Sequence, residues 1–578
     1  MFFIFVLGLA APATIDAVGK ARAGQRALEN AADAVRVSDA DLAERELTTA
    51  LQELRGASNA LDSWLTWPAR TVPGTSRQYK AASAIVRSAE LLANAGSGPL
   101  GVLRAQPGGF ALRNGAFDLG ALTRAGEALT AATPAAQEAR RAIENAPSGW
   151  LLPPLESARA EAADEVTGAA DAIVKGAAGL RAAPTLLGSD GPKRYIVLHS
   201  NLAELRGTGG ILSYYTLIEA DAGQLRLLPE SGRTARDLPR PSEVGVKPPQ
   251  WYMDTWGRYN PLNTWQNINM TTDFPTAADI FVQTASAKFG PIDGAIQIDP
   301  YGLSALLKLS GPVSVPGWPE PITSSNIPKI AQHDMYVRFE EIEPRDAFGE
   351  NLISAVFGKF ITSNLQPRLS SLQGLGDAVG QGHLKVYSTN DAVQQELARA
   401  EIDGGLHTDG ATDVLGVFNQ NAGANKLDWF LRRSIRYEVR PGPNDTAFGI
   451  LTVTLRNEAP SSGLPQYILG PNTNGIAAGE NRTILTVIRP RGSRLLAANT
   501  GGKSSLATID QDKDLLAHQI RLSVPPGESE TVEMIFILDP AVLNHYRLTL
   551  VTQPTVAVDD CRLLIERIPA SRLPRACL

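Results

Sequence analysis

The sequence has little of what several common enzyme classes require. Its 578 residues include two cysteines and six histidines, and the histidines are scattered without the spacing of metal ligands. It contains no Gly-x-Ser-x-Gly stretch, the turn that carries the nucleophile of α/β-hydrolases. Gly501-Gly-Lys503-Ser-Ser resembles half of a P-loop, but Ala497 stands where the first glycine is needed. Zinc enzymes, serine hydrolases and P-loop nucleotidases are therefore not expected.

An excess of positive charge is also missing. The formal net charge is −6, whereas a nucleic-acid binder needs a concentrated basic surface, so no nucleic-acid partner is expected. Hydrophobic residues make up 43% of the chain and charged residues 20%, which are globular rather than disordered proportions. A chain of this length exceeds one ordinary hydrophobic core, so we expect several domains.

The two cysteines, Cys561 and Cys577, lie sixteen positions apart near the C-terminal end. In an oxidising compartment they could close a small disulfide loop, and otherwise they are two unrelated thiols. The sequence leaves both alternatives open.

A hydrophobic run long enough for a complete membrane span is missing too. Residues 1–13 are strongly apolar, but Asp16 follows before the ~20 residues that a bilayer needs. No basic segment precedes the run, as it would in a signal peptide. Three alternatives stay open: a membrane anchor whose upstream residues are not included, a short signal peptide, or the first turns of a buried helix. We expect residues 1–15 to be an anchor or signal segment, with the rest of the chain outside the cytoplasm.

Residues 16–183 have the texture of a helical stalk or elongated bundle. Alanine is dense, and Leu47, Leu51, Leu54 and Leu61 follow a heptad-like seam. Breaks are predicted around residues 67–76 and, from a second Gly- and Pro-rich stretch, around 96–109. A partner-binding coiled coil is the alternative to a simple spacer.

The remaining chain changes texture twice. In residues 184–425, strand-like and helix-like segments alternate, which predicts a layered α/β core. In residues 426–578, short alternating strands are separated by Gly, Pro and Asn clusters, which predicts a β-sandwich of the Ig-like kind. We therefore expect a multidomain protein with a helical stalk, an α/β core and a C-terminal β-sandwich.

One loop in the core gathers chemistry within ten residues, Asn201-Leu-Ala-Glu204-Leu-Arg206-Gly-Thr-Gly-Gly210. Asn201, Glu204 and Arg206 could bind a cation or phosphate oxygens, and the glycines would let backbone N–H groups approach the same anion. The alternative is a tight turn in which Glu204 and Arg206 pair with each other.

Further candidates lie downstream. Asn269 and Asp273 could reach the same pocket as Glu204, but Asp273 before Pro275 is also a plain helix cap. Asp299 before Pro300 has the same two interpretations. Arg338 and Arg345 lie near a predicted helix end, where each could reach an anion or simply be solvated.

Residues 194 to about 440 resemble the bacterial family DUF4012, a domain of unknown function. The resemblance is carried by Asn201-x-x-Glu204-Leu-Arg206-x-Thr-Gly-Gly, Asn269-x-x-x-Asp273-Phe-Pro, Asp293-Gly, Asp299-Pro, Gly311-Pro-Val and Leu427-Asp428-Trp-Phe-Leu-Arg432-Arg433. The helical front and the β-rich tail also look like that family's flanks. The family brings no established activity.

The order of elements is also similar to the LytR-CpsA-Psr (LCP) family. Its members are membrane-anchored and transfer glycopolymers from a polyprenyl-pyrophosphate carrier to the bacterial cell wall, using magnesium and several arginines. Ile196–Arg206 resembles its first strand and Asp-Ser-Arg loop, Leu225–Arg233 its strand before a Pro-Arg-Asp motif, and Gly290–Val315 its run ending in Gly-Gly-Val. Tyr336-Val-Arg338 and Arg345-Asp346 resemble its later arginine motifs.

This chain departs from the LCP pattern at two places. No acid stands near Gly209–Ile211, where the second metal-binding aspartate belongs, and the Pro-Arg-Asp motif is reduced to Glu230-Ser-Gly-Arg233. An intact magnesium site is therefore in doubt. A bound polyprenyl phosphate still fits, because arginines and backbone amides can hold pyrophosphate without a full metal set.

These resemblances imply a bacterial envelope protein with one N-terminal membrane anchor that binds a polyprenyl-pyrophosphate-linked glycan and transfers it or assists its assembly or export. The implied catalytic residues are Glu204, Arg206 and Asp273, with Glu204 and Asp273 as Mg²⁺ ligands. The implied ligand-binding residues are Asn201, Arg233, Asn269, Asp299, Arg338 and Arg345. The alternative is a non-catalytic scaffold or interaction protein with a degenerate LCP-like core and protein partners, or a carbohydrate-binding module in the β-sandwich. Whether the chain is an enzyme stays open.

Overall fold

The structure is a computed structural model that describes residues 2–72, 74–106, 111–365, 369–408, 413–443, 446–539, 542 and 546–565. The chain divides into two compact units. The first comprises Met1–Leu112, Phe117–Thr185 and Gln366–Gln373, and the second comprises Arg113–Ala116, Leu186–Leu365 and Gly374–Leu578. Cys577 lies outside the described residues, so the possible disulfide between Cys561 and Cys577 also lies outside them.

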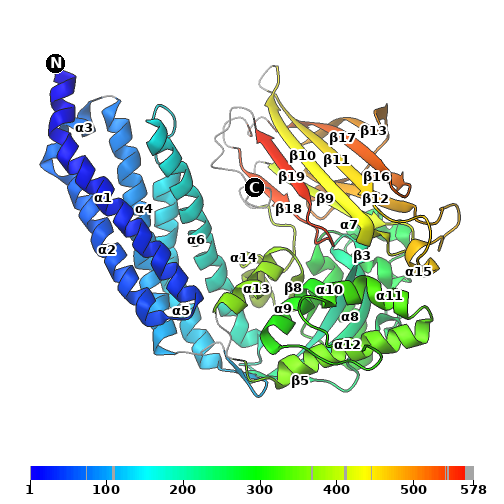
Figure 1. Cartoon of the computed structure of the whole chain (residues 1–578). Coiled ribbons are helices and arrows are strands. Elements are labelled where there is room, and N and C mark those ends of the chain that lie inside the picture. The colour runs from blue at the N-terminus through cyan, green and yellow to red at the C-terminus, as the bar shows by residue number, and fades with distance from the viewer. Residues whose placement is uncertain are drawn as a thin grey trace. The chain divides into compact units, whose positions relative to one another are not determined.

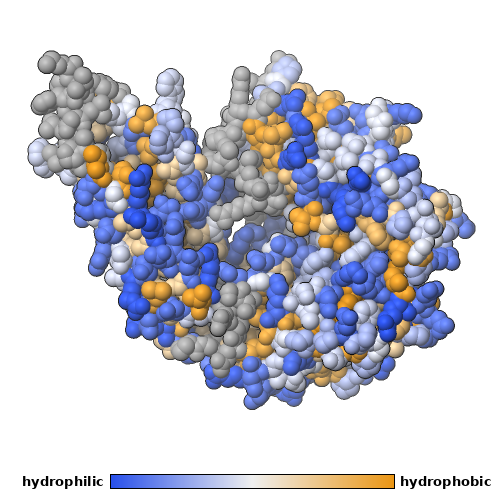
Figure 2. Space-filling view, viewed as in Figure 1, coloured by the Kyte–Doolittle hydropathy of each residue, from blue (hydrophilic) through white to orange (hydrophobic). Residues whose placement is uncertain are grey.

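The described part of the first unit is helical, as its alanine-rich sequence predicts (Figure 1). Its helices are α1 (Phe2–Arg36), α2 (Ala40–Asp62), the 3-10 turn η1 (Trp64–Thr66), α3 (Trp67–Thr71), α4 (Thr75–Ala105), α5 (Leu119–Glu144) and α6 (Pro153–Leu186). Hydrophilic residues cover much of its visible face (Figure 2).

Heptad spacing explains how α2 packs. Leu47, Leu54 and Leu61 recur every seven residues and are buried, so they form one stripe along the helix. The side chain of Asp39 accepts a hydrogen bond from Leu42 N at 2.9 Å and caps the helix start. The break predicted from Gly96 is too early, since α4 continues through Pro99 to Ala105. Packing of α4 against α2 and α5 offsets the weak helix propensity of that stretch.

The predicted single N-terminal anchor is contradicted. No helix within the described residues is both long and apolar enough to span a bilayer. The helix α1 has the length, but its sequence gains Asp16, Lys20 and Arg22 after the short apolar run, and each of these charges is costly in hydrocarbon.

The first sheet of the second unit is mixed. Its main strands are neighbours in the order β5-β4-β3-β7-β8, and β6 pairs with β4. Their bounds are β3 (Lys193–Arg206), β4 (Gly209–Asp221), β5 (Gln224–Leu227), β6 (Arg233–Thr234), β7 (Gly294–Ile298) and β8 (Leu384–Ser388), with the short strands β1 (Leu112–Arg113) and β2 (Ala116–Phe117) earlier in the chain. Val313 and Ile322 form an isolated antiparallel bridge outside these strands.

Helices cover both faces of this sheet, which gives the layered α/β arrangement that the alternating segments predict (Figure 1). Side chains alternate along β3, so Ile196 and Leu198 pack with α7 and α8, while Tyr195 and Val197 pack with α9 and α12. The helices are α7 (Gln250–Trp256), α8 (Phe274–Phe289), α9 (Pro300–Ser310), α10 (Ile327–Lys329), α11 (Met335–Arg338), α12 (Ile342–Thr362), α13 (Leu369–Gly380) and α14 (Asp391–Arg399). Between them lie η2 (Ala235–Asp237), η3 (Gly257–Tyr259), η4 (Trp265–Met270) and the π-helical turn η5 (Ile330–Asp334).

The C-terminal part of the second unit is β-rich. One sheet has the order β14-β13-β17-β11-β10-β19 and the other has the order β15-β16-β12-β9-β18. Residues of both sheets, such as Leu451 and Leu485, share one buried core. The strands are β9 (Asp413–Asn421), β10 (Leu431–Pro441), β11 (Ala447–Asn457), β12 (Asn481–Pro490), β13 (Arg494–Thr500), β14 (Lys503–Ser504), β15 (Thr508–Asp512), β16 (Leu515–Val524), β17 (Ser529–Leu538), β18 (Leu548–Val551) and β19 (Asp560–Ile565), with η6 (Leu427–Phe430) and α15 (Gln466–Leu469) between them.

Candidate functional site

The segment Asn201–Gly210 is the buried junction of β3 and β4 rather than an open loop. Its residues are all buried, and the pairing of the two strands shifts register between Asn201 and Leu205. Gly207 stands at the turn, where a Cβ atom would lie 2.2 Å from Met270 O and 2.3 Å from Thr271 O. Close backbone packing therefore requires this glycine, whether or not any anion approaches it.

Glu204 is held by two cationic side chains in this junction. Its Oε2 lies 2.8 Å from Nζ of Lys426 and its Oε1 lies 3.4 Å from Nη2 of Arg206. Glu204 is 6% exposed, Arg206 7% and Lys426 3%. Burial alone would lower the pKa of Lys426, but the negative charge of Glu204, with two nearby tyrosines, raises it instead. Glu204 thus has two buried cationic partners inside the protein.

The guanidinium of Arg206 donates hydrogen bonds to three backbone carbonyls. Its Nη1 donates to Leu205 O at 2.9 Å and to Asn421 O at 3.1 Å, and its Nε donates to Gln266 O at 3.1 Å. These acceptors belong to β3, β9 and η4, so Arg206 connects the α/β core to the β-rich region. A guanidinium whose Nε and Nη1 already donate to backbone carbonyls does not offer a pair of N–H donors to a phosphate.

Two more predicted residues lie in the same place. Asn201 donates to the hydroxyl of Tyr336 at 2.7 Å, and the guanidinium of Arg345 stacks 3.9 Å from the ring centre of Tyr467. Tyr336 and Tyr467 stack on each other at 5.4 Å, and Lys426 lies over both rings. We call the following residues the Glu204 cluster: Asn201, Glu204, Arg206, Tyr336, Arg345, Lys426 and Tyr467.

The remaining acidic and amide candidates lie apart from this cluster. They cap helices or form hydrogen bonds between segments. Asn269 donates to Thr208 Oγ1 at 3.0 Å and to Gly210 O at 2.9 Å. Asp273 caps α8 and accepts from Lys513 Nζ at 3.0 Å. Asp299 caps α9 and lies 2.7 Å from Nδ1 of His383. The capping arrangements considered from the sequence are present at both aspartates.

Arg233 and Arg338 are exposed and do not join the Glu204 cluster. Arg338 donates from Nε to Gly317 O at 3.0 Å and lies over the ring of Trp318 at 5.5 Å. Of the arginines predicted to neutralise a pyrophosphate, the structure thus brings Arg206 and Arg345 together and leaves the others outside.

The carboxylates predicted to hold Mg²⁺ do not form a shared donor set. Glu204 faces Lys426 and Arg206, whereas Asp273 faces Lys513 and backbone N–H groups. Within the described residues, no group of three or more His, Cys, Asp or Glu could hold a metal ion. The two carboxylates predicted to bind Mg²⁺ are therefore not brought together, and a role for magnesium stays a prediction.

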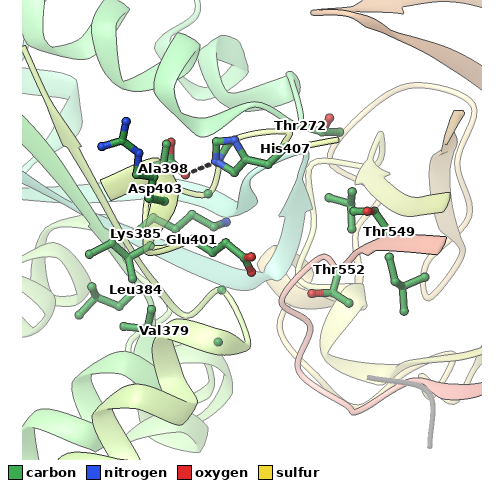
Figure 3. Close-up of a pocket in the computed structure, with 18 of the residues that line it drawn as sticks. Thr272, Val379, Leu384, Lys385, Ala398, Glu401, Asp403, His407, Thr549 and Thr552 are labelled. Atoms are coloured by element: carbon green, nitrogen blue, oxygen red, sulfur yellow. Dashed lines mark hydrogen bonds and ion pairs between the residues drawn. The ribbon is translucent and has the colours of Figure 1, made fainter. Parts of the chain in front are cut away.

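A cavity of about 580 Å³ opens beside β8, bordered by Gly207 and by residues of β18 (Figure 3). Lys385 and Glu401 extend toward it from one side, Thr549 and Thr552 lie on the other, and His407 stands next to Asp403 (Figure 3). The cavity is lined by Gly207, Thr272, Val379, Gly380, Gly382, Leu384, Lys385, Gln395, Ala398, Arg399, Glu401, Ile402, Asp403, Gly404, Gly405, His407, Phe418, Thr549, Leu550, Val551 and Thr552.

Lys385 is the most unusual residue of this cavity. It is 7% exposed, and its Nζ donates to Thr208 O. Burial lowers the pKa of Lys385 to about 8, although the charge of Asp299 partly opposes this shift. The ammonium form therefore predominates at neutral pH, inside the protein.

His407 and Asp403 form a pair at the cavity edge. Nε2 of His407 lies 2.6 Å from Oδ1 of Asp403, and this hydrogen bond raises the pKa of His407. Asp403 also accepts from Gln394 Nε2 at 2.9 Å and from Gly405 N at 3.1 Å, which fix its orientation. The imidazole is thereby held in one orientation with increased positive character.

Sequence reasoning missed Lys385, Asp403 and His407. The six histidines show no ligand spacing, and a single lysine in the short stretch Leu384–Ser388 resembles an ordinary solvated residue. The one available signal was Asp403-Gly-Gly-Leu-His407, where glycines separate an acid from a histidine. Only the fold shows that Lys385 points inward.

Comparison with known proteins gives little functional information. No curated protein matches the sequence. A crystal structure described as a "putative nutrient binding protein" from Legionella pneumophila is similar over 22% of this chain and 43% of its own length, with 8% identity and a TM-score of 0.14. A similarity of that extent supports no argument about fold or function.

One family model matches. Its segment includes the Asn201, Asn269, Asp293, Asp299 and Gly311 motifs and ends before the motif at Leu427–Arg433. The resemblance recognised from those motifs is confirmed within these bounds, and the LCP resemblance is not supported by any match. Residues 190–336 of this chain match the family described as "Protein of unknown function (DUF4012)".

Proposed function

We propose that this chain is a non-catalytic scaffold or interaction protein in which the Glu204–Arg206 motif serves as a structural joint. The observation that carries the proposal is the burial of both side chains with their charges paired internally. Glu204 is bound by Lys426 and Arg206, and Arg206 donates to three backbone carbonyls. A catalytic acid or a phosphate-binding arginine must be accessible to its ligand, whereas the residues of a structural joint are buried against one another.

The same joint extends through the Leu427–Arg433 motif. Asp428 accepts from Leu205 N at 2.8 Å and from Asn481 Nδ2 at 2.9 Å, and burial raises its pKa. Arg433 donates from Nη1 to Val417 O at 3.1 Å and pairs with Asp559. Motif residues far apart in the sequence thus tie β3 to the β-rich sheets. In this proposal the core is an LCP-like relic and the β-rich region an Ig-like presentation module.

Transfer of a polyprenyl-pyrophosphate-linked glycan stays a prediction. It requires Arg206 and Glu204 to contact the pyrophosphate, and the space around them contains Tyr336, Tyr467 and Lys426. The filled space around Glu204 and Arg206 favours the scaffold.

The test is to incubate the purified full chain with a polyprenyl-pyrophosphate-linked glycan and Mg²⁺, comparing wild type, Arg206→Ala and the exposed control Arg338→Ala. We expect no glycan transfer by any of them, and a lower melting temperature for Arg206→Ala alone. Transfer by wild type that Arg206→Ala abolishes while keeping its melting temperature would refute the scaffold role.

A further inference from the structure

The cavity beside β8 is separate from the Glu204 cluster, since none of that cluster's residues lines it. We infer that this cavity binds a small hydroxylated carboxylate, such as a sugar acid, with its carboxylate held by Nζ of Lys385. The inference goes beyond the scaffold role and does not depend on it, because the two rest on different residues.

The first argument is a missing counter-charge. An ammonium group has three N–H donors, and among the described residues Nζ of Lys385 finds Thr208 O as an acceptor and no ion-pair partner. The carboxylate of Asp299 is occupied by His383 and by the start of α9. A buried cation without a partner is costly, so a ligand carboxylate entering the cavity would supply both the charge and the acceptors.

The second argument is the charge of the lining. Lys385 and Arg399 are the basic residues of the lining, but Arg399 is paired with Glu396, so Lys385 supplies the positive charge for a ligand. His407, whose charge is favoured by Asp403, adds part of one positive charge. One ammonium group balances one negative charge, so a monoanion matches this lining better than a phosphate dianion. A monoanionic carboxylate is therefore the oxyanion that fits.

The third argument concerns the rest of the ligand. Thr549 and Thr552 face Lys385 across the cavity, and Thr272 lies on its border (Figure 3). Gly404 and Gly405 also lie in the lining, where the absence of side chains leaves room for a ligand. Hydroxyl groups suit a body with several hydroxyls. The volume of about 580 Å³ lies within the range of small-molecule sites and accommodates a monosaccharide or disaccharide acid.

The experiment is isothermal titration calorimetry of the full chain with D-glucuronate, using D-glucose and inorganic phosphate as comparison probes. We expect D-glucuronate to bind at least about tenfold more tightly than either, since one charge-assisted hydrogen bond corresponds to roughly that ratio. Equal binding of D-glucose would overturn the role of the carboxylate. Tighter binding of phosphate, or no binding of D-glucuronate, would overturn the assignment of the ligand class.

Two further measurements locate the site. Lys385→Met should weaken D-glucuronate binding at least about tenfold, while Lys247→Met, at an exposed lysine of the same unit, should not change it. If Lys385→Met fails to fold, amine acylation of the wild-type chain followed by peptide mass spectrometry replaces it. D-glucuronate should then protect Lys385 and leave Lys247 reactive. Unchanged affinity in Lys385→Met, or no protection of Lys385, refutes the inference.

Discussion

Nζ of Lys426 lies 2.8 Å from Oε2 of Glu204, although 222 positions separate the two residues in the chain. Neither residue has an appreciable exposed surface, so the ion pair joins the start of η6 in the β-rich region to β3 of the α/β core. A buried ion pair of this kind fixes an arrangement more than it adds stability, because both ions lose their hydration.

Breaking that pair on one side should be strongly destabilising. We expect Glu204→Gln to reduce the free energy of unfolding by about 3–5 kcal/mol, because it leaves buried Lys426 and Arg206 without their carboxylate. Lys426→Met should cost less, because Glu204 keeps its contact with Arg206. The double variant Glu204→Gln/Lys426→Met should recover part of that loss, since Lys426 no longer needs a counter-charge while Arg206 still lacks its own. Urea unfolding of the four proteins measures the coupling. Single losses below about 1 kcal/mol would mean that water reaches the pair.

Removing the charge of Lys385 should stabilise the ligand-free chain. Its folded pKa of about 8 lies below the ordinary value of 10.5, so the folded state releases its proton first. Stability therefore rises with pH between 8 and 10.5, and below pH 8 the buried charge costs about 3 kcal/mol in full. Lys385→Met should lack this rise. Parallel curves for wild type and variant from pH 7 to 10.5 would contradict the prediction.

Two buried histidines should make the second unit sensitive to acid. Burial lowers the pKa of His199 to about 3 and that of His518 to about 4, whereas an exposed histidine titrates near 6.5. The unfolded chain binds protons first as the pH falls, so each histidine removes about 1.4 kcal/mol of stability per pH unit below 6.5. In the part of the chain that the structure describes, neither ring nitrogen of His518 has a hydrogen-bond partner.

His518→Leu tests this directly. The variant should unfold at higher urea concentration than wild type at about pH 5, with a smaller difference at about pH 7.5, because leucine has no proton to gain. The matched control His407→Gln changes a histidine that already has a carboxylate partner and should not show this pattern. An equal stability change of His518→Leu at both pH values would contradict the assignment.

Gly207 and Gly358 should respond in opposite directions to a methyl group. Gly207→Ala places Cβ against Met270 O and Thr271 O at a separation that no side chain can occupy, so we expect a loss of at least about 4 kcal/mol. Gly358 lies in α12 with nothing within 4 Å of the position that an added Cβ would take, so Gly358→Ala should gain about 0.5–1 kcal/mol of helix propensity. Thermal melting of both variants against wild type gives the comparison, and a tolerated Gly207→Ala would contradict the close packing.

Much of the fold could be predicted because local pattern sets local structure. Three features depend on neighbours in sequence: the leucine repeat of α2, the Asp273 cap with Pro275 in the first turn of α8, and the alternating strands after residue 430. Prediction failed where packing overrides propensity, as in α4, which continues through Pro99. It also failed at residues 1–15, where an apolar run was extended into a membrane anchor that the described helices do not provide.

For the candidate site, the sequence by itself determined which residue types are present, and it identified the resemblance to DUF4012 that is confirmed over residues 190–336. Tertiary structure alone decided what those residues do. It placed Lys426 against Glu204 and backbone carbonyls against Arg206, and it turned Lys385 into a cavity that, among the described residues, offers it no counter-ion. The physical reason is that the role of a charged side chain depends on its partners and its hydration. Both are set by segments that are distant in the sequence.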